Sequence, residues 1–437
     1  MMKLISAKIP LLFCFLVFSV KAQSSTYSEK YFDQNLDHSS TTSKTFKQRY
    51  YHIDKFAKSV DAPVLVEICG EWECLVNEGN LNFDLAKKIG AHLIILEHRY
   101  FGKSTPFKLL TKENLSYLTF ENVLSDIANF QTSLVEQKGL TGNWIYTGVS
   151  YAGTVAAYFQ LEYPHLAAGA VASSAPMKGK LIFDEIDSHA YNTLTPSCRA
   201  AVLAANKDIE KYFLNGTQKL FKATLFFDYP IVEEEYRSLA GLLAIGMIQL
   251  GPNFISFFCT SIEATPNAET IAKFHNNLKI QDGIDVFGNF GLGLGATKNL
   301  KYGKNKIMRQ WTYLSCRVFG FFQPANLDRN QSILPASLGI DIFLKTCEDE
   351  FGVLDVQGNI DEFNAKYFEK YIKNPKGASI ITTNGSIDHW KLLSVIDEKY
   401  LHDKSHGADL SNIYDSAIMR VTRLRIYNQV RAWAFSQ

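Results

Sequence analysis

Five short apolar runs are the feature that most limits the folds open to this chain. Helix-like segments stand between them, for example at 122–136 and 154–162. Short buried strands that alternate with helices indicate βαβ units around a mostly parallel sheet. The sequence therefore predicts an α/β fold, with strands at 64–68, 93–96, 144–147, 168–172 and 379–382.

The middle of the chain has a different character. Residues 180–345 carry long helical patterns at 209–225 and 234–250, and strand-like residues resume only near 380, before a last helix expected at 415–435. We therefore expect a helical insertion in a single α/β domain. The predicted division is a first core part at 23–179, the insertion at 180–345 and a second core part at 346–437.

Residues 1–22 are predicted to be a cleaved secretory signal. Lys3 and Lys8 precede an apolar run at 9–20, and Ala22 offers a small-residue cleavage site. A membrane anchor is the alternative, but about 12 apolar residues fall short of the ~20 that cross a bilayer. The charges of the whole chain nearly balance, at 45 Lys+Arg and 44 Asp+Glu. That balance gives no electrostatic case for a nucleic-acid partner.

Six cysteines remain outside the signal, and an even number in a secreted chain predicts disulfides. Sequence alone does not choose among the possible pairings. Cys69 and Cys74 flank a short loop that a bridge between them would stiffen; pairing elsewhere and a reduced state are the alternatives. The six residues are Cys69, Cys74, Cys198, Cys259, Cys316 and Cys347.

Asn-x-Ser/Thr sequons mark candidate glycosylation sites at Asn114, Asn215 and Asn330. A fourth sequon, at Asn384, lies in a stretch that we predict to be catalytic. We therefore expect no glycan there.

Ser150 stands at the apex of a strand–turn–helix segment. Residues 148–153 read GVSYAG, so the G-x-S-x-G pattern of a nucleophile elbow appears as G-x-S-x-A, with Gly153 one place later. Small residues around the serine let the strand and the helix approach, and the turn lifts the hydroxyl clear of the backbone. A Gly/Ser turn in any βα unit is the alternative. Because a predicted strand precedes the turn and a predicted helix follows it, we favour Ser150 as a nucleophile.

A serine nucleophile needs a base and an acid that orients the base. In α/β-hydrolases the chain order is Ser, acid, His. Asp388 follows the last predicted strand, at an edge where catalytic loops gather. His402 and His406 both lie in the loop before the last helix, and small neighbours favour His406 without settling the choice. His389 adjoins the acid and is poorly placed to bridge it to Ser150.

The oxyanion hole is expected to use backbone N–H groups at two places. One is that of Tyr151, directly after the nucleophile. The other comes from the loop after the strand at 64–68, where Gly70 and Glu71 are the candidates.

Further motifs follow one another along the whole chain. They are LEHRYFGKS at 96–104, the elbow at 148–153, Trp311-x-Tyr313 with Cys316, Cys347-Glu348, N-G-x-x-D-x-W at 384–390 and H-x-x-D-L at 406–410. In these motifs the chain resembles the secreted serine peptidases that include lysosomal Pro-Xaa carboxypeptidase, dipeptidyl peptidase II and the thymus-specific serine protease, with the thymus-type branch nearest.

The resemblance implies an α/β-hydrolase core whose helical insertion, at 180–345, is a cap. It assigns Ser150 as nucleophile, Asp388 as acid and His406, rather than His402, as base. It also implies exopeptidase action on peptides, often beside proline, whose fixed φ and missing N–H make its bonds awkward for proteases that bind extended strands.

Several positions depart from the family pattern. Val149 replaces the usual Gly before the serine, and His389 replaces a Pro after the acid. Gly407 stands where a small residue or Cys follows the catalytic His. Val318 replaces an acid in the cap. The triad residues themselves are present, so these departures bear on substrate choice.

Our leading hypothesis is a secreted or lysosomal-type serine exopeptidase that needs no metal or organic cofactor. We expect peptide substrates, no nucleic-acid partner and no stable membrane insertion; the oligomeric state is open, with a homodimer as one option. One alternative is an esterase or lipase-like hydrolase on the same core. The other is a peptide-binding homologue that has lost turnover, for which Val149 and Val318 are the only support.

Overall fold

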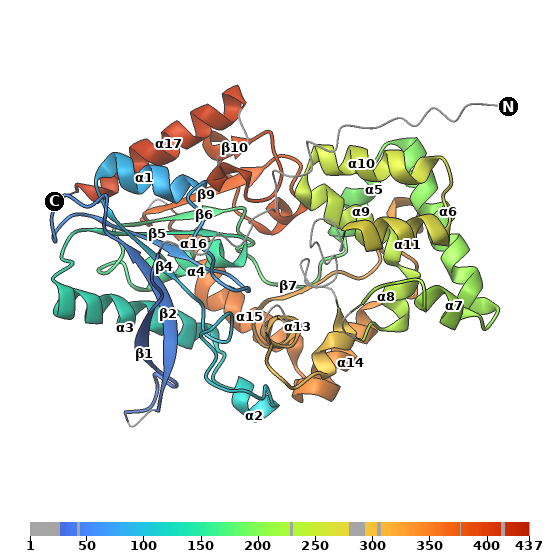
Figure 1. Ribbon diagram of the computed structural model, residues 1–437, viewed down its shortest axis with the longest axis horizontal. Helices are drawn as coiled ribbons and strands as arrows, with labels where there is room; N and C mark the ends of the chain where they lie inside the picture. The colour runs from blue at the N-terminus through green and yellow to red at the C-terminus, as the bar shows by residue number, and fades with distance from the viewer. Residues whose placement is uncertain are drawn as a thin grey trace.

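The computed structural model describes residues 27–41, 44–227, 230–278, 293–303, 307–375, 377–411 and 416–436. A lobe built on a large sheet and a helical lobe lie side by side (Figure 1). The predicted α/β fold is confirmed. The predicted signal at 1–22 lies outside the described residues.

The large sheet has eight strands in the order β1-β2-β4-β3-β5-β6-β9-β10. β1 pairs with β2, and β2 with β4, in antiparallel fashion, and the remaining neighbours are parallel. The five predicted strands appear as β3, β4, β5, β6 and β9. The bounds are β1 Lys30–Asn35, β2 Thr45–Ile53, β3 Val64–Ile68, β4 His92–Leu96, β5 Trp144–Val149, β6 Gly169–Ser173, β9 Ile380–Gly385 and β10 Leu401–His402.

Helices cover both faces of this sheet. Because successive strand residues point to opposite faces, Leu65 joins the core under α1 and α17, whereas Val66 joins the core under α3 and α4. Local signals set the helix ends: Thr119 caps the start of α3 by accepting from Asn122 N, and Gly139 ends it at a φ of 67°. The bounds are α1 Leu81–Ile89, α2 Lys112–Leu115, α3 Phe120–Lys138, α4 Tyr151–Glu162 and α17 Ala417–Ala434.

The helical lobe follows β6. Its central helix, α9, is apolar around most of its surface and is buried against α6 and α10, which the Cys198–Cys259 disulfide joins. The helix predicted at 209–225 is broken at Gly216, whose φ of 70° ends α6, and the one at 234–250 is divided at Ser238. The bounds are α5 Glu185–Thr193, α6 Pro196–Leu214, α7 Gln218–Lys222, α8 Glu233–Arg237, α9 Leu239–Leu250, α10 Pro252–Glu263 and α11 Ala268–Asn277.

The chain then returns to the sheet through shorter elements. β7 (Lys180–Ile182) and β8 (Gly320–Phe322) form a separate two-stranded parallel sheet, and the Cys316–Cys347 disulfide ties η4 to α14. All strands of the large sheet come from residues before 180 or after 345, so we keep the division at 23–179, 180–345 and 346–437 as a proposal. The remaining bounds are η3 Leu294–Lys298, α13 Met308–Leu314, η4 Ser315–Phe319, η5 Arg329–Gln331, α14 Ile340–Phe351, α15 Val356–Phe363, η6 Asn364–Phe368, α16 Glu369–Lys373, η7 His389–Leu393, η8 Glu398–Tyr400 and η9 Ala408–Leu410.

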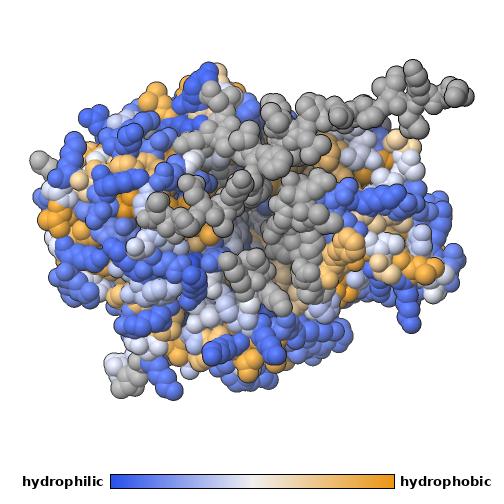
Figure 2. All heavy atoms as spheres, viewed as in Figure 1, coloured by the Kyte–Doolittle hydropathy of each residue, from blue (hydrophilic) through white to orange (hydrophobic). Residues whose placement is uncertain are grey.

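The surface of both lobes is mixed in character. Figure 2 shows polar side chains spread over the sheet-bearing lobe and over the helical lobe, with apolar atoms scattered among them. Within the described part of the chain, no helix has the combination of length and apolar character that crossing a membrane requires.

Candidate active site

Ser150 occupies a strained turn between β5 and α4. Its φ is 58° and its ψ is −132°, a backbone conformation that residues with a side chain rarely adopt and that is common at functional sites. Its N–H donates to Ser173 O at 2.8 Å, which fixes the turn to the neighbouring strand. A Cβ on Gly148 would lie 2.3 Å from Ala152 O. Glycine at 148 is therefore required for strand and helix to meet so closely.

Asp388 and His406 form a direct pair. Asp388 follows β9 and His406 follows β10, and His406 Nδ1 lies 2.7 Å from Asp388 Oδ2. The Asp388 side chain is fully buried, and its Oδ1 accepts from Trp390 N at 3.0 Å. His402 lies elsewhere, with its Nε2 3.5 Å from Asp409 Oδ1. The imidazole that contacts the predicted acid is therefore that of His406.

The two members of this pair stabilise each other's charge. Burial acts to raise the pKa of Asp388, but the neighbouring His406 outweighs it and the pKa is lowered. Burial likewise acts to lower the pKa of His406, but the charge and hydrogen bond of Asp388 raise it above its ordinary value. The site therefore favours a carboxylate beside an imidazole that protonates readily.

The serine is not hydrogen-bonded to this pair. His406 Nε2 is buried without a hydrogen-bond partner. Ser150 lies near His406 because Val149, which precedes the serine, packs against Gly407, which follows the histidine. Catalytic hydrogen bonds in unliganded enzymes often tighten only when the substrate is bound. The structure thus joins the predicted acid to the predicted base and brings the serine close to them, with the serine–histidine bond unformed.

The loop after β3 runs beside the start of α4. A Cβ on Gly70 would be 3.8 Å from that of Ala152, which places the loop next to Tyr151. A Cys69–Cys74 disulfide closes the loop, so that this candidate pairing is confirmed. The backbone N–H groups predicted for the oxyanion hole thus come from neighbouring segments.

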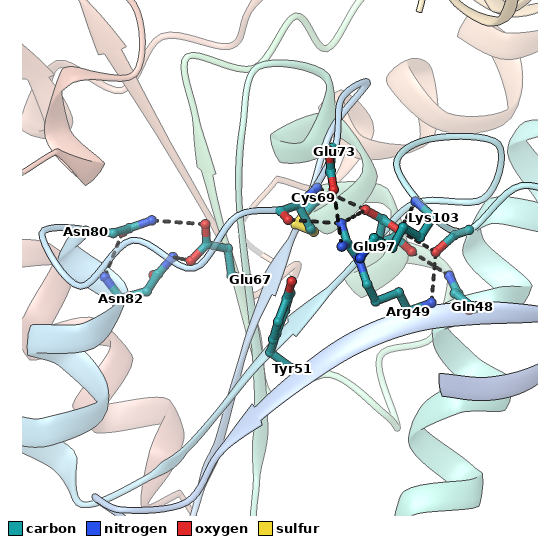
Figure 3. The surroundings of a disulfide bond; sticks show 12 residues. Gln48, Arg49, Tyr51, Glu67, Cys69, Glu73, Asn80, Asn82, Glu97 and Lys103 are labelled. Atoms are coloured by element: carbon teal, nitrogen blue, oxygen red, sulfur yellow. Dashed lines mark hydrogen bonds and ion pairs between the residues drawn. A yellow bond between two sulfur atoms is a disulfide. The ribbon is translucent and has the colours of Figure 1, made fainter. Parts of the chain in front are cut away.

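A buried ion pair anchors the same loop (Figure 3). Arg49 on β2 donates to Cys74 O at 3.0 Å and pairs with Glu97, whose Oε1 also accepts from Cys74 N at 3.0 Å. Sequence reasoning placed Glu97 in a family motif without finding this role. This role depends on β2, which carries Arg49 and which the sequence did not predict, so it could not be inferred beforehand.

A pocket of about 750 Å³, counted with the space open to solvent, lies beside Ser150. Core residues form one wall, and residues from the helical lobe and the returning segment form the other. Most of its lining is apolar or aromatic. The lining residues are Glu71, Ser150, Tyr151, Pro176, Gln249, Leu294, Ile307, Trp311, Thr312, Ser315, Phe321, Phe322, Gln323, Phe343 and Trp390.

The end of α9 reaches both loops that carry the acid and the base. Trp390 Nε1 donates to Gln249 Oε1 at 3.1 Å, and Ser405 Oγ donates to Leu250 O at 3.2 Å. Trp390 lies two residues after the acid, and Ser405 directly precedes the base. The helical lobe is therefore in contact with the residues that hold the acid–base pair.

Two further buried histidines near the site have lowered pKa values, so their rings are neutral at pH 7. His98 Nε2 lies 2.9 Å from Tyr151 Oη while its Nδ1 lies 2.6 Å from Arg99 O, and burial lowers its pKa to about 4. His389, which replaces the family's proline, is buried, and this burial lowers its pKa to about 3. Neither ring contacts the acid by a hydrogen bond.

A second buried carboxylate lies behind the pair. Asp409 accepts from Ser173 Oγ at 2.5 Å and from Thr383 Oγ1 at 2.6 Å, and it faces His402. It therefore connects the loop of His406 to the ends of β6 and β9. From the sequence alone, Asp409 could be identified only as part of a motif.

The described residues offer no convincing metal site. The group with metal-like spacing is Cys198, Cys259 and Glu263, but the two cysteines form a disulfide and so provide no thiolate.

The four sequon asparagines differ in exposure. Asn215 and Asn330 are exposed, and Asn114 is half-buried with its Nδ2 donating to Leu109 O at 2.9 Å. Asn384 is buried. The glycosylation of the first three stays a prediction.

A mixed sheet of this order, a serine on a strained turn after β5 and an acid–imidazole pair after the late strands together define an α/β-hydrolase. The chain belongs to the serine carboxypeptidase S28 family, whose pattern it matches over residues 34–240 and 255–426. It is a serine-type peptidase, and the resemblance inferred from its motifs is confirmed.

Relatives from plants and animals span most of the chain. It is 31% identical to the probable serine protease EDA2 of Arabidopsis thaliana, over 84% of this chain and 76% of that protein. It is 27% identical to the thymus-specific serine protease of Mus musculus, over 89% and 84%. It is 25% identical to the lysosomal Pro-X carboxypeptidase of Mus musculus, over 93% and 89%.

Proposed function

We propose that this peptidase is an exopeptidase that hydrolyses short peptides, often beside proline, through a Ser150–His406–Asp388 triad and an acyl-enzyme intermediate. The observation that carries the proposal is the 2.7 Å contact between His406 Nδ1 and Asp388 Oδ2, next to a serine held at a positive φ. A buried carboxylate on Nδ1 leaves Nε2 as the atom that exchanges protons with a substrate or nucleophile.

In the proposed mechanism, Ser150 Oγ attacks the peptide carbonyl carbon while His406 Nε2 accepts the hydroxyl proton. Asp388 holds the imidazole in the required tautomer and stabilises its charged form. Backbone N–H groups of Tyr151 and of Gly70 or Glu71 stabilise the oxyanion. His406 then gives its proton to the leaving amine, and water hydrolyses the acyl-enzyme by the same steps.

The pocket supports the substrate proposal. The side chains of Trp311, Phe321, Phe343 and Trp390 in its lining are apolar and suit a compact apolar residue such as proline. Residues of the helical lobe and of the returning segment line the pocket together with core residues, which favours short peptides and chain ends over folded proteins.

The proposed location is the secretory pathway, either outside the cell or in a lysosome or vacuole. Three disulfides, Cys69–Cys74, Cys198–Cys259 and Cys316–Cys347, support an oxidising compartment. We propose no cofactor, no nucleic-acid partner and no membrane insertion for this reaction. A homodimer stays an open proposal.

A fluorophosphonate probe tests the nucleophile. We expect it to label the wild type and S256A, whose serine is exposed on the surface, and to fail on S150A. Equal labelling of S150A and the wild type would refute the assignment. Turnover of Xaa-Pro peptides and of simple acyl esters should then be compared, because turnover of esters alone would favour an esterase.

A further inference from the structure

Glu71 is a carboxyl group that the proposed mechanism does not use. Only its backbone N–H is a candidate for the oxyanion hole, whereas its side chain lines the pocket together with Ser150 and Tyr151. Its Oε2 atom is buried and has no hydrogen-bond partner. A buried carboxylate oxygen without a donor is costly, so a group that supplies one is expected.

The rest of the pocket's described lining offers no cationic side chain. Among the described residues that line it, Glu71 is the one carboxyl, and neither lysine nor arginine is present. The neutral Gln323 also presents a buried Oε1 atom without a partner. The unpaired atoms of these two side chains are both acceptors, and together they suit a ligand that donates hydrogen bonds and carries positive charge.

One ionisable group of the protein acts on Glu71, and Glu71 in turn acts on two. The charge of His406 lowers the pKa of Glu71, and the charge of Glu71 in turn raises the pKa values of His406 and Tyr151. Burial is the largest effect, and it raises the pKa of Glu71 to about 7. The site is thus short of positive charge even with the imidazole nearby.

We propose that Glu71 binds an ammonium group of the peptide substrate. The inference rests on the proposed function in one respect, namely that a peptide enters beside Ser150. Two parts of a peptide carry this chemistry: a free amino terminus and a lysine side chain. An ammonium has three donors, more than Glu71 Oε2 alone requires.

Binding to the S150A variant tests this independently of turnover. Calorimetry at pH 8, where Glu71 is largely ionised, would use two matched pairs of short proline-containing peptides. The first pair differs in a free against an acetylated amino terminus. In the second pair the amino terminus is acetylated in both peptides, and a lysine in one peptide is replaced by norleucine in the other. The charged member of at least one pair should bind about ten- to a hundred-fold more tightly.

The double variant S150A/E71Q should lose that difference, because glutamine keeps the shape and the backbone N–H but removes the charge. S150A/E73Q is the matched control: Glu73 lies two residues further along the same bridged loop and pairs with Arg49 outside the pocket. It should retain the difference. Whichever pair shows the effect identifies the source of the ammonium.

Three results would overturn the proposal: no difference within either pair, a difference that survives E71Q, or an equal loss of affinity for all four peptides. The last would mean that Glu71 acts only on His406. Failure of the proposed function is a separate result, since wild-type enzyme that hydrolyses no peptide could still show the charge-dependent binding at Glu71.

Discussion

Gly407 and Val149 are in such close contact that a Cβ on Gly407 would come within 2.6 Å of Val149 Cγ1. Gly407 directly follows His406, and Val149 directly precedes Ser150. Gly407 also has a φ of 63° and donates its N–H to Ser174 Oγ at 2.9 Å. The departure from the family at position 149 is thus accommodated by a residue with no side chain, and this contact joins the segment of the proposed nucleophile to that of the proposed base.

The first prediction concerns this contact. G407A should lower kcat by at least about 10-fold, because a displacement of the base by a fraction of an ångström weakens catalysis. KM should change less. Steady-state kinetics on a proline-containing peptide would measure both.

A second substitution separates crowding from backbone strain in that variant. V149G/G407A removes the clash but keeps the alanine at a positive φ, which costs roughly 1–2 kcal/mol. We expect partial recovery of kcat. A G407A enzyme with wild-type kcat would show that the contact does not set the geometry.

The second prediction concerns pH. Because Asp388 raises the pKa of His406 above 6.5, and the base must be neutral to accept a proton, kcat/KM should rise with pH through that raised pKa. D388N removes the charge, so the acid limb should move to lower pH while kcat falls by about 10⁴-fold through the wrong tautomer. Profiles from pH 4 to 9 would show both, and an unmoved limb in D388N would contradict the pairing.

The third prediction concerns stability at Glu71. Its pKa is raised from 4.5 to about 7 by burial. The unfolded chain therefore loses this proton at lower pH than the folded chain, and ionisation between pH 4.5 and 7 disfavours the folded state. E71Q should raise Tm above the wild-type value at pH 8 and leave it unchanged at pH 4. Thermal unfolding with E73Q as the control would test this, and an equal shift at both pH values would argue against a titrating Glu71.

The fourth prediction concerns Asp409. D409N keeps the size of the side chain but sets an amide against the hydroxyl donors of Ser173 and Thr383 and removes the charge facing His402. Breaking a buried charged group's contacts in this way should lower the free energy of unfolding by about 3–5 kcal/mol. Chemical denaturation would measure it.

The same variant has a kinetic readout. Because Asp409 holds the loop of His406, D409N should also lower kcat, and the acid limb should shift to lower pH, since Asp409 contributes to the raised pKa of His406. T383V, which removes a single donor, should have a smaller effect on both. A stable D409N enzyme with unchanged kcat and an unchanged pH profile would show that Asp409 does not position His406.

Sequence patterns located the centre of the sheet but not its edges. β3, β4, β5, β6 and β9 are buried on both faces and stand out as apolar runs. β1 and β2 are rich in polar and charged residues, and β10 has only two residues, so none of them gives that signal. The breaks at Gly216 and Ser238 also escaped prediction, because a helical pattern on both sides hides a local end.

The site residues that could be predicted are those marked by a pattern in the neighbouring sequence. Ser150 and Asp388 follow strands that the sequence predicts, so their positions could be inferred. The choice between His406 and His402 depends on how the loop after β10 folds, and the residues alone left it open. The contacts of His98, Arg49 and Asp409 join segments distant in the chain, and no local pattern contains them.

The chain leaves the large sheet after β6 and rejoins it at β9, and the proposed nucleophile and its base lie on opposite sides of that excursion. A ribosome therefore synthesises Ser150 more than two hundred residues before Asp388 and His406. A nascent or truncated chain that ends within the helical lobe holds a hydroxyl with nothing to activate it. Proteolytic power would then arise only once synthesis is complete and the two lobes have come together.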